Sequence, residues 1–380
     1  MYDLLAYGAM MADRGRTAAY ARALEAAVKP GSVVLDIGTG PGIMALLACR
    51  AGAARVYAVE PAGVVDVARE IAAANGVADR ITFIQALSTA IDLPERVDGI
   101  VAEIHGVLPL YRRSIVSLLD ARARFLKPAG WMIPQRETLW AALVSSPAAH
   151  ATVTRGWNNE YGFDFRAAAS RAVNQVRRCA FAPSEVVGTP RCWASLEYDS
   201  LQSPDVRGSV TCRSDSSATV HGLAIWFDTE TGSGAGFSNS PVRGERHIFE
   251  QLFMPWPEPV TIDAGTPVTV ELRADFTGDD YVLTWTSEVA GASAASRRRF
   301  RQSSLFAELL GQSELRKRSP EHVAQVGADA AADRRIIERL EEGRRLGEIA
   351  EEARGAFPGL FPDWNAAMAR VGSLSVRYGR

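Results

Sequence analysis

The sequence predicts an α/β fold: a Rossmann-like, doubly wound parallel sheet, then an antiparallel β-barrel domain, then a C-terminal helical appendage. Three observations predict it. Short apolar β-branched runs alternate with helical segments over residues 31–134, which is typical of a parallel sheet. Short β-rich runs separated by turn signals fill residues 135–302, as in barrels and sandwiches. Residues 303–380 are charged and have a helical pattern.

The elements of the first region follow from hydrophobic periodicity. Apolar runs of four or five residues are bounded by turn residues and predict buried strands, while longer stretches with apolar residues every three or four positions predict helices. The expected strands are Val33–Ile37, Val56–Val59, Ile81–Gln85, Gly99–Ala102 and Trp131–Ile133, and the expected helices include Gly63–Asn75 and Tyr111–Leu126.

The second and third regions are justified in the same way. Alternating apolar and polar residues predict six antiparallel strands: Thr138–Val144, Ala194–Tyr198, Thr219–Asp228, His247–Met254, Val268–Arg273 and Tyr281–Glu288. In the third region, Asp333–Glu342 and Leu346–Ala356 are amphipathic and predict a helix, a tight turn and a second helix.

Composition excludes several classes of protein. The chain has 380 residues and a net charge of −2 without a basic block, so we expect no nucleic-acid partner. Its four cysteines lack metal-ligand spacing and are expected to be reduced, and no metal site is expected. There is neither a signal-like N-terminus nor a run of 18 apolar residues. These features predict a cytoplasmic protein without a membrane segment.

A glycine-rich loop follows the first predicted strand. The strand ends in Asp36, and Gly38, Gly40 and Gly42 follow at alternate positions. Glycines there permit a tight turn and let a ligand lie close to the backbone. Glu60, at the end of the next strand, is placed to accept hydrogen bonds from both hydroxyls of a ribose. The pattern predicts a nucleoside site, and dinucleotide-dependent dehydrogenases share it.

Two details of the loop favour a cationic ligand over a pyrophosphate. Asp36 places a negative charge at the end of the strand, and Pro41 removes a backbone donor where the helix begins. A phosphate would need the opposite arrangement. The order Asp-x-Gly-x-Gly-x-Gly and then Glu is typical of class I methyltransferases, whose cofactor, S-adenosyl-L-methionine, carries a sulfonium and an ammonium.

Several further segments, in order from about residue 2 to 290, resemble the protein arginine methyltransferase family. Its Met-Leu-x-Asp-x-x-Arg-Thr segment is similar to residues 10–17, and its Phe-Pro-Asp-Arg barrel entry to Ile133-Pro134-Gln135-Arg136. The other matching segments are Trp157–Asp164, which lies just before the family's dimerisation arm, and the barrel segments Ala224–Asp228 and Gly236–Pro241.

The resemblance implies a set of cofactor contacts, with helices in residues 1–30 covering the cofactor. It implies that Arg16 pairs with the cofactor carboxylate, Glu60 holds the ribose and Met10 packs near the sulfonium. The family often has a glutamate at the adenine amine, where this chain has Ser88 and Thr89. The expected cofactor-binding residues are Met10, Arg16, Asp36, Gly38, Gly40, Gly42, Glu60, Ser88, Thr89 and Glu103.

The acceptor loop departs from the family pattern. The family brackets a guanidinium with two glutamates; here Glu103 matches the first, and Arg112 stands at the second. Two cations at contact distance repel by several kcal/mol where the effective dielectric constant is low. A guanidinium acceptor is therefore disfavoured if Arg112 faces the pocket, whereas a solvated Arg112 leaves it open. We expect Glu103 to orient the acceptor, and Arg112 or Arg246 to bind or aim a carboxylate.

A second departure lies in the barrel. The family has a Thr-His-Trp loop whose histidine pairs with an aspartate of the N-terminal helix, and here residues 246–248 read Arg-His-Ile. The resemblance pairs His247 with Asp13, either as a general base or as a link between domains. His105, a lone histidine of the acceptor loop, is expected at the surface.

These features predict an S-adenosylmethionine-dependent methyltransferase that modifies an O or N nucleophile of a peptide or small-molecule acceptor. The alternatives are an arginine N-methyltransferase with a degenerate glutamate loop and a non-catalytic scaffold that binds cofactor and peptides. The resemblance implies a homodimer with an arm near residues 165–190. Residues 333–350 resemble the small winged-helix modules that bind leader peptides, with a lid or dimer-support appendage as the other interpretation.

Overall fold

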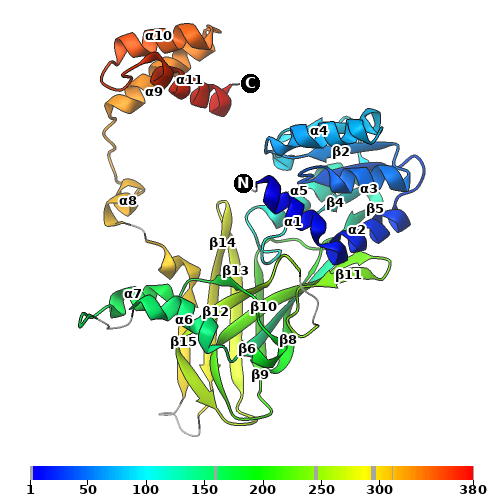
Figure 1. Ribbon diagram of the computed structural model, residues 1–380, viewed down its shortest axis with the longest axis vertical. Helices are drawn as coiled ribbons and strands as arrows, with labels where there is room; N and C mark the ends of the chain where they lie inside the picture. Colours follow the sequence, from blue (N-terminus) through cyan, green and yellow to red (C-terminus); the bar gives the residue numbers. More distant parts are fainter. Residues whose placement is uncertain (1–2, 158–160, 244–246, 292–296, 310, 380) are drawn as a thin grey trace. The chain divides into compact units, whose positions relative to one another are not determined.

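The computed structural model describes residues 3–157, 161–243, 247–291, 297–309 and 311–379. The chain divides into two compact units, Met1–Glu308 and Leu309–Arg380. The first unit extends past the expected boundary at 302, because strand β15 (Arg298–Ser303) pairs with β14 and a short 3-10 helix, Ser304–Ala307, follows it. Figure 1 shows the elements of each unit.

A five-stranded parallel sheet forms the first layer of the larger unit, in the order β3-β2-β1-β4-β5. Its strands are apolar on both faces, since helices pack on both sides of a doubly wound sheet. The strand order reverses at β1, which pairs with both β2 and β4, so a ligand crevice is expected beyond the carboxyl ends of these strands. The strands are β1 Val33–Ile37, β2 Arg55–Val59, β3 Ile81–Ile84, β4 Val97–Ala102 and β5 Leu126–Ile133, and the helices are α3 Ile43–Ala51, α4 Val64–Ala74 and α5 Ser114–Phe125, with 3-10 helices Ala78–Arg80 and Ser88–Ala90.

Two helices precede the sheet, and each begins at an aspartate. Asp3 caps α1 (Leu4–Ala12) by accepting from the amide of Ala6, and Asp13 caps α2 (Arg14–Ala27) by accepting from the amide of Arg16. An aspartate at this position satisfies a backbone donor that the helix leaves open. Helix α2 buries one face, including Arg16, whereas none of the described residues of α1 is buried. Helix α1 therefore lies on the surface and adds little to the core.

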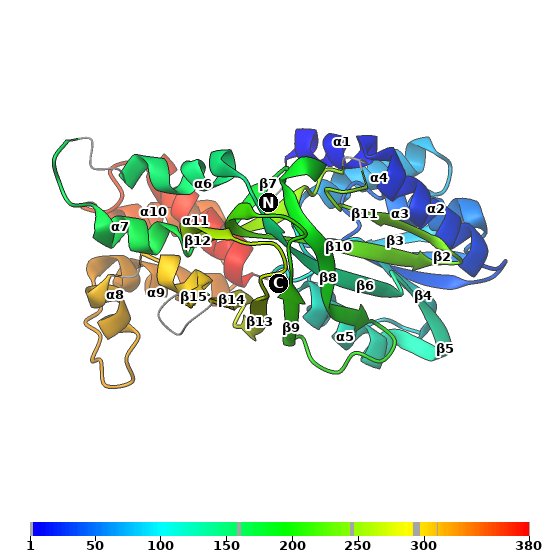
Figure 2. The same cartoon turned by 90° about the horizontal axis from the view of Figure 1, so that it is seen from below.

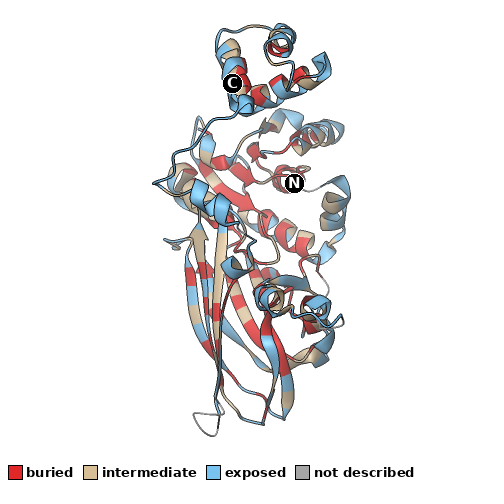
Figure 3. Ribbon diagram, turned by 90° about the vertical axis from the view of Figure 1, so that its left-hand side faces the viewer, coloured by how far each residue is buried: buried red, intermediate tan, exposed pale blue. Residues whose placement is uncertain are grey.

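Antiparallel strands form the second layer, as two sheets whose edges meet at β8 and β9. Strand β13 alternates buried and more exposed residues, as a strand with one face on a core should. Figure 3 shows buried and more exposed positions along the long strands of this layer. The first sheet, in the order β7-β12-β10-β6-β8, contains β6 Arg136–Val144, β7 Arg177–Cys179, β8 Val186–Glu197, β10 Ala218–Gly232 and β12 Gln251–Ile262, with β11 Ala235–Ser238 on β10; the second, β15-β14-β13-β9, contains β9 Val206–Cys212, β13 Val268–Thr277 and β14 Asp280–Val289. The predicted barrel is confirmed.

The segment between β6 and β7 is helical. It contains α6 (Pro147–Thr154), a 3-10 turn at Arg155–Trp157 and α7 (Arg166–Ala172), and the two helices lie side by side (Figures 1 and 2). The expected arm at 165–190 is therefore misplaced in its second half, because β7 pairs with β12, and β8, which begins at Val186 after a 3-10 turn at Pro183–Glu185, pairs with β6. Part of the Trp157–Asp164 motif, residues 158–160, lies outside the described residues.

The smaller unit is helical and has its own core. Its helices are α8 Gln312–Lys317, α9 Ala328–Glu341, α10 Leu346–Ala356 and α11 Trp364–Tyr378. Ile336 of α9, Ile349 and Ala350 of α10 and Val371 of α11 are buried together. The predicted helix, turn and helix are confirmed. The winged-helix interpretation is not supported, because residues 311–379 contain no strand that could form a wing.

Candidate active site

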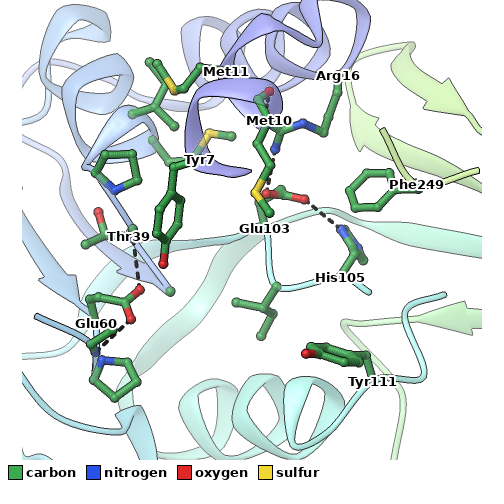
Figure 4. Close-up of a pocket in the computed structure, with 18 of the residues that line it drawn as sticks. Tyr7, Met10, Met11, Arg16, Thr39, Glu60, Glu103, His105, Tyr111 and Phe249 are labelled. Atoms are coloured by element: carbon green, nitrogen blue, oxygen red, sulfur yellow. Dashed lines mark hydrogen bonds and ion pairs between the residues drawn. The ribbon is translucent and has the colours of Figure 1, made fainter. Parts of the chain in front are cut away.

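A cavity of about 470 Å³ lies beyond the carboxyl ends of β1, β2 and β4, where the strand order reverses. Its walls come from α1, the start of α2, the glycine loop, the residue after β2 and the loop between β4 and α5 (Figure 4). The lining residues are Tyr7, Met10, Met11, Arg16, Gly38, Thr39, Gly40, Pro41, Ile43, Met44, Glu60, Pro61, Ala62, Glu103, Ile104, His105, Tyr111, Arg112 and Phe249.

The glycine loop is packed too closely for side chains. Gly38 has φ +72° and Gly40 φ +52°, a region that other residues rarely adopt. A Cβ on Gly38 would lie 2.4 Å from Cγ2 of Ile104, and one on Gly40 would lie 2.9 Å from the Tyr7 ring. Gly42 also has a positive φ and precedes α3. The loop is thus shaped to bring backbone against the cavity.

Glu60 follows β2 and points its carboxylate toward the cavity (Figure 4). Oε2 accepts from the amide of Gly40 at 3.1 Å, and Oε1 accepts from the amide of Ala62 at 2.9 Å. The carboxylate is therefore fixed by two backbone donors, while each oxygen can accept a further hydrogen bond. This geometry suits the paired hydroxyls of a ribose.

Asp36 lies behind the wall of the cavity, not on it. It is buried, and Oδ2 accepts from the hydroxyl of Thr39 at 2.5 Å; Thr39 does line the cavity. Burial raises the pKa of Asp36 to about 7, although the Thr39 hydrogen bond opposes the rise. Asp36 can therefore influence a cationic ligand in two ways: through its hydrogen bond with Thr39, and through the electrostatic field of its carboxylate when it is ionised.

Arg16 is buried at the start of α2 and links two sides of the cavity. Nη2 donates to the carbonyl of Met10 at 2.6 Å, and Nη1 forms an ion pair with Oε2 of Glu103 at 2.6 Å. Nε of Arg16 is buried and has no hydrogen-bond partner among the described residues. A buried guanidinium with an open donor is suited to an anionic group of a ligand.

Ser88 and Thr89 do not reach the cavity. They lie in the 3-10 helix Ser88–Ala90, and the carbonyl of Ser88 accepts from Nη2 of Arg124 at 2.8 Å. The described wall includes neither residue, so the structure does not support the adenine contact expected of their side chains.

His105, in the acceptor loop, differs most from its expected environment. His105, expected at the surface, is buried on the cavity wall with 8% of its area exposed. Nδ1 lies 3.3 Å from Oε1 of Glu103, and Nε2 forms an ion pair with Oε1 of Glu137. The expectation was wrong because the partner Glu137 is on β6, far from the loop in sequence. Burial alone would lower the pKa of His105, but Glu137 and Glu103 raise it to about 10.

Arg112 lines the same cavity as His105 and Glu103. Its side chain is exposed, its guanidinium stacks on the ring of Tyr111 at 5.2 Å, and both residues line the cavity. Its backbone has φ +45°, and its amide donates to Oδ1 of Asp280 at 2.8 Å. Arg112, the cation at the position of the family's second glutamate, is thus held on the cavity wall.

Asp13 and His247 form the expected pair. Nδ1 of His247 lies 3.0 Å from Oδ1 of Asp13, and the amide of Ile248 donates to Oδ2 at 3.0 Å. A Cβ on Gly15 would lie 2.9 Å from Cε1 of His247, so the ring packs against α2. The described cavity wall includes neither His247 nor Asp13. This arrangement favours the link between α2 and the barrel over the general base.

Sequence reasoning did not select six residues that shape the site, and the reasons differ. Tyr7 and Thr39 adjoin known motifs and could have been found by helical spacing and by their place in the loop. Tyr111 adjoins Arg112 in the acceptor loop. The other three, His105, Glu137 and Phe249, meet through contacts between the acceptor loop and the barrel, which no local pattern shows. The six are Tyr7, Thr39, His105, Tyr111, Glu137 and Phe249.

The fold and the cavity together define a class I methyltransferase, and the residues fit S-adenosylmethionine. Glu60 presents a fixed carboxylate for the ribose, Gly38 and Gly40 leave room for a ligand at the backbone, and Arg16 has an open buried donor for the methionine carboxylate. The cofactor would supply a sulfonium-bound methyl group.

The comparisons with known proteins agree. Residues 12–135 match the family model of ribosomal protein L11 methyltransferase, and residues 135–288 match the arginine methyltransferase oligomerization subdomain. An arginine N(omega)-methyltransferase of Streptomyces achromogenes is 33% identical over 287 residues, covering 71% of this chain and 76% of that protein. Protein arginine N-methyltransferase 6 of Danio rerio is 29% identical, covering 71% and 81%.

Solved structures share the fold. A Trypanosoma brucei protein arginine methyltransferase 1 enzyme–prozyme complex gives a TM-score of 0.72 at 24% identity, covering 78% of this chain and 96% of that one. Arabidopsis thaliana protein arginine methyltransferase 10 gives 0.70 at 24%, covering 79% and 97%. A probable protein arginine N-methyltransferase 6 of the same plant is 33% identical over 248 residues, and this chain spans 55% of its length.

The chain belongs to the protein arginine methyltransferase-like family of class I S-adenosylmethionine-dependent methyltransferases. The resemblance to this family is therefore confirmed, and the rival dehydrogenase interpretation of the glycine loop is excluded. Within the described ranges, we find no helix with the length and apolar character needed to span a membrane.

Proposed function

We propose that the protein transfers the methyl group of S-adenosylmethionine to an N or O nucleophile of a peptide or small molecule that carries a carboxylate near the reacting atom. One observation supports this choice of acceptor above all others. Arg112, which stands where the family has an anion, lines the same cavity as Glu103.

The local structure supports a binding role for Arg112. Its backbone is tied to Asp280 at the tip of the β13–β14 hairpin, and its guanidinium is supported by the ring of Tyr111. A guanidinium binds a carboxylate through two parallel hydrogen bonds, which fixes the orientation of the acceptor. It would repel a second guanidinium in the same space.

The remaining chemistry is mainly positioning. Methyl transfer from a sulfonium is an in-line displacement, so the nucleophile must be held about 3 Å from the methyl carbon. Glu103 is placed to accept a hydrogen bond from an N–H or O–H of the acceptor, and α1 covers the cavity and excludes water through Tyr7 and Met10.

The test is a panel of acceptors in matched pairs that differ by one carboxylate, such as an amino acid without a guanidinium against the corresponding amine. Formation of S-adenosylhomocysteine is measured for each. We expect the carboxylate-bearing member to be preferred, and Arg112→Ala to reduce that preference by about 1 kcal/mol, roughly 5-fold, because the Arg112 side chain is exposed. Arg113→Ala, which removes a neighbouring arginine that pairs with Asp279, should retain it.

Equal turnover of both members by the wild-type enzyme would refute the carboxylate proposal. No S-adenosylhomocysteine with any acceptor would instead favour the scaffold alternative.

A second candidate is arginine N-methylation, and the names of the relatives favour it. Glu103 is retained to contact a guanidinium, and in free arginine the α-carboxylate would be available to Arg112. Peptidyl arginine lacks that carboxylate. Turnover of peptidyl arginine that is unaffected by Arg112→Ala would establish ordinary protein arginine methylation and show that Arg112 is merely solvated.

We further propose that the protein forms a homodimer through the segment α6–α7. This segment projects from the barrel and exposes Tyr161 (80%) and Phe163 (66%). Large exposed aromatic side chains mark protein contact surfaces. Light scattering at tens of micromolar should show a dimer, and the double variant Tyr161→Ser with Phe163→Ser should shift it to monomer, whereas a monomeric wild type would refute the proposal.

A further inference from the structure

A row of four charged side chains runs from the cavity into the barrel. Arg16 contacts Oε2 of Glu103, whose Oε1 faces Nδ1 of His105. Nε2 of His105 in turn contacts Oε1 of Glu137. The charges of the row alternate, and neither Glu137 nor the Tyr198 beyond it is on the described cavity wall.

The hydrogen bonds of Glu137 determine the charge state of His105. Glu137 is fully buried; Oε2 accepts from the hydroxyl of Tyr198, and Oε1 accepts from Thr229 at 3.1 Å as well as facing His105. A carboxylate can only accept, so Nε2 of His105 must donate. Nδ1 faces the second carboxylate, Glu103, and must donate too. A ring that donates from both nitrogens is an imidazolium.

Sheet register, not the loop, sets the position of Glu137. Glu137 on β6 lies opposite Thr229 on β10 and Leu196 on β8. Placing a carboxylate in a barrel interior is costly unless it has a partner of opposite charge. In the described structure His105 is its contacting cation, so each residue accounts for the burial of the other.

Aromatic rings fix the plane of the imidazolium. His105 lies 5.4 Å from the ring of Phe227 at a tilted angle and 5.8 Å from that of Phe249 edge-on. The ring can therefore hardly rotate to another partner. The ionisable groups that face His105 or its partners are Arg16 and Tyr20 of α2, Asp36 of β1, Glu103 of its own loop, Glu137 of β6 and Tyr198 after β8.

We propose that His105 is a positioning residue, which acts with Glu137 behind it to hold Glu103 in place for the acceptor. The imidazolium holds one oxygen of Glu103 and Arg16 holds the other, so the carboxylate is oriented before an acceptor arrives. This role is independent of which acceptor is methylated, and thus does not rest on the carboxylate proposal.

The charge of Glu137 determines how the charge of His105 depends on pH. While Glu137 is ionised, His105 keeps its charge throughout the neutral range and the anchor of Glu103 is constant. Without the charge of Glu137, the burial that disfavours a charged ring is no longer offset, and the histidine should lose its proton at a lower pH. The neutral ring would carry no charge and only one N–H donor, so His105 would hold Glu103 less firmly as pH rises.

The first experiment measures the charge directly. The full-length protein is labelled with ¹³C at histidine Cε1, and the His105 signal among the five histidines is identified by its loss in His105→Gln. In the wild type it should remain that of an imidazolium from pH 6 to 8.5. In Glu137→Gln, which keeps a side chain able to bond Tyr198 and Thr229, the signal should titrate within that range. Glu271→Gln, an exposed carboxylate of β13, is the matched control and should behave as the wild type.

The second experiment tests positioning, with calorimetry using S-adenosylhomocysteine beside turnover of the best acceptor of the panel. We expect His105→Gln to lower kcat about 10-fold or more while cofactor affinity changes little. Glu137→Gln should lose activity as pH rises through the new His105 midpoint. Two results would overturn the proposal. One is titration of wild-type His105 near pH 6.5, and the other is an affinity for S-adenosylhomocysteine that falls as much as kcat does in both His105→Gln and Glu137→Gln.

Discussion

The two ends of the cavity differ in how their side chains are held. At the cofactor end, Glu60 is fixed by the amides of Gly40 and Ala62, both within about 20 residues along the chain. The other end, formed by the loop between β4 and α5, is where we propose that the acceptor binds, and we call it the acceptor end. There His105 is fixed by Glu137, which comes from the barrel domain and is itself held by Tyr198 and Thr229. The cofactor end is a local motif, and the acceptor end is a product of the domain interface.

This difference predicts that the cofactor end and the acceptor end of the cavity can change independently. A change in the glycine loop disturbs backbone geometry and cofactor binding together. A change at the interface, such as arginine at position 112, alters the charge presented to the acceptor and leaves the glycine loop and Glu60 in place. The following predictions test the contrast, from the largest expected effect to the smallest.

Removal of Glu60 should damage the cofactor end most. Glu60→Ala removes the carboxylate from the ribose position, and loss of hydrogen bonds to a charged group typically costs about 1.5–3 kcal/mol, or roughly 10- to 150-fold in affinity. Calorimetry with S-adenosylmethionine measures the change. Glu70→Ala, an exposed glutamate of α4, is the control. Unchanged affinity in Glu60→Ala would contradict the assigned cofactor site.

A side chain on the glycine loop should destabilise the fold. Gly38→Ala forces a Cβ to within 2.4 Å of Ile104 at a positive φ, and such strain costs on the order of 1–3 kcal/mol. Urea unfolding measures the loss. Gly63→Ala, where a Cβ meets nothing within 4 Å and φ is −63°, should change stability far less. Equal stability of the two variants would show that the loop is more pliable than its contacts indicate.

Asp36 should make cofactor binding depend on pH. Its folded pKa of about 7 lies above the ordinary 3.8, so it is mostly neutral at pH 6 and mostly ionised at pH 8. The ionised form favours a cationic ligand, so affinity for S-adenosylmethionine should rise with pH, by at most about tenfold over this range. For the protein without ligand the sign is reversed, because the raised pKa means that stability falls as pH rises from about 4 through 7.

Calorimetry at pH 6, 7 and 8 checks the effect of Asp36 on cofactor affinity. In Asp36→Asn the affinity should vary less over the same range. A wild-type affinity that is constant or falls as pH rises would show that the charge of Asp36 does not contribute to binding of S-adenosylmethionine.

Removal of the smaller unit should have the smallest effect. The larger unit, Met1–Glu308, contains every residue that lines the cavity, and residues 309–380 include a separate buried core. A chain ending at Glu308 should therefore bind S-adenosylmethionine with unchanged affinity by calorimetry. A fall of more than about tenfold, equal to 1.4 kcal/mol, would give the helical unit a part in the cofactor site.

The sequence by itself determined the order of the layers and the cofactor loop. Strands such as Val33–Ile37 show period-two or continuous apolar patterns, and glycines at 38 and 40 are required by positive φ, so both features depend on neighbours along the chain. The match of the Arg16, Asp36 and Glu60 motifs to a known family added their roles. Local chemistry of this kind can be interpreted without coordinates.

Only the tertiary structure decided the acceptor end. His105 was expected to be exposed because no residue near it in sequence explains a buried histidine; its partner Glu137 is brought to it by the packing of the barrel against the parallel sheet. Ser88 and Thr89 were expected on the cavity, yet they lie in the 3-10 helix Ser88–Ala90 and the described cavity wall includes neither. The physical reason is the same in both cases: the free energy of a buried charge or polar group depends on partners across the fold, and local periodicity contains no information about them.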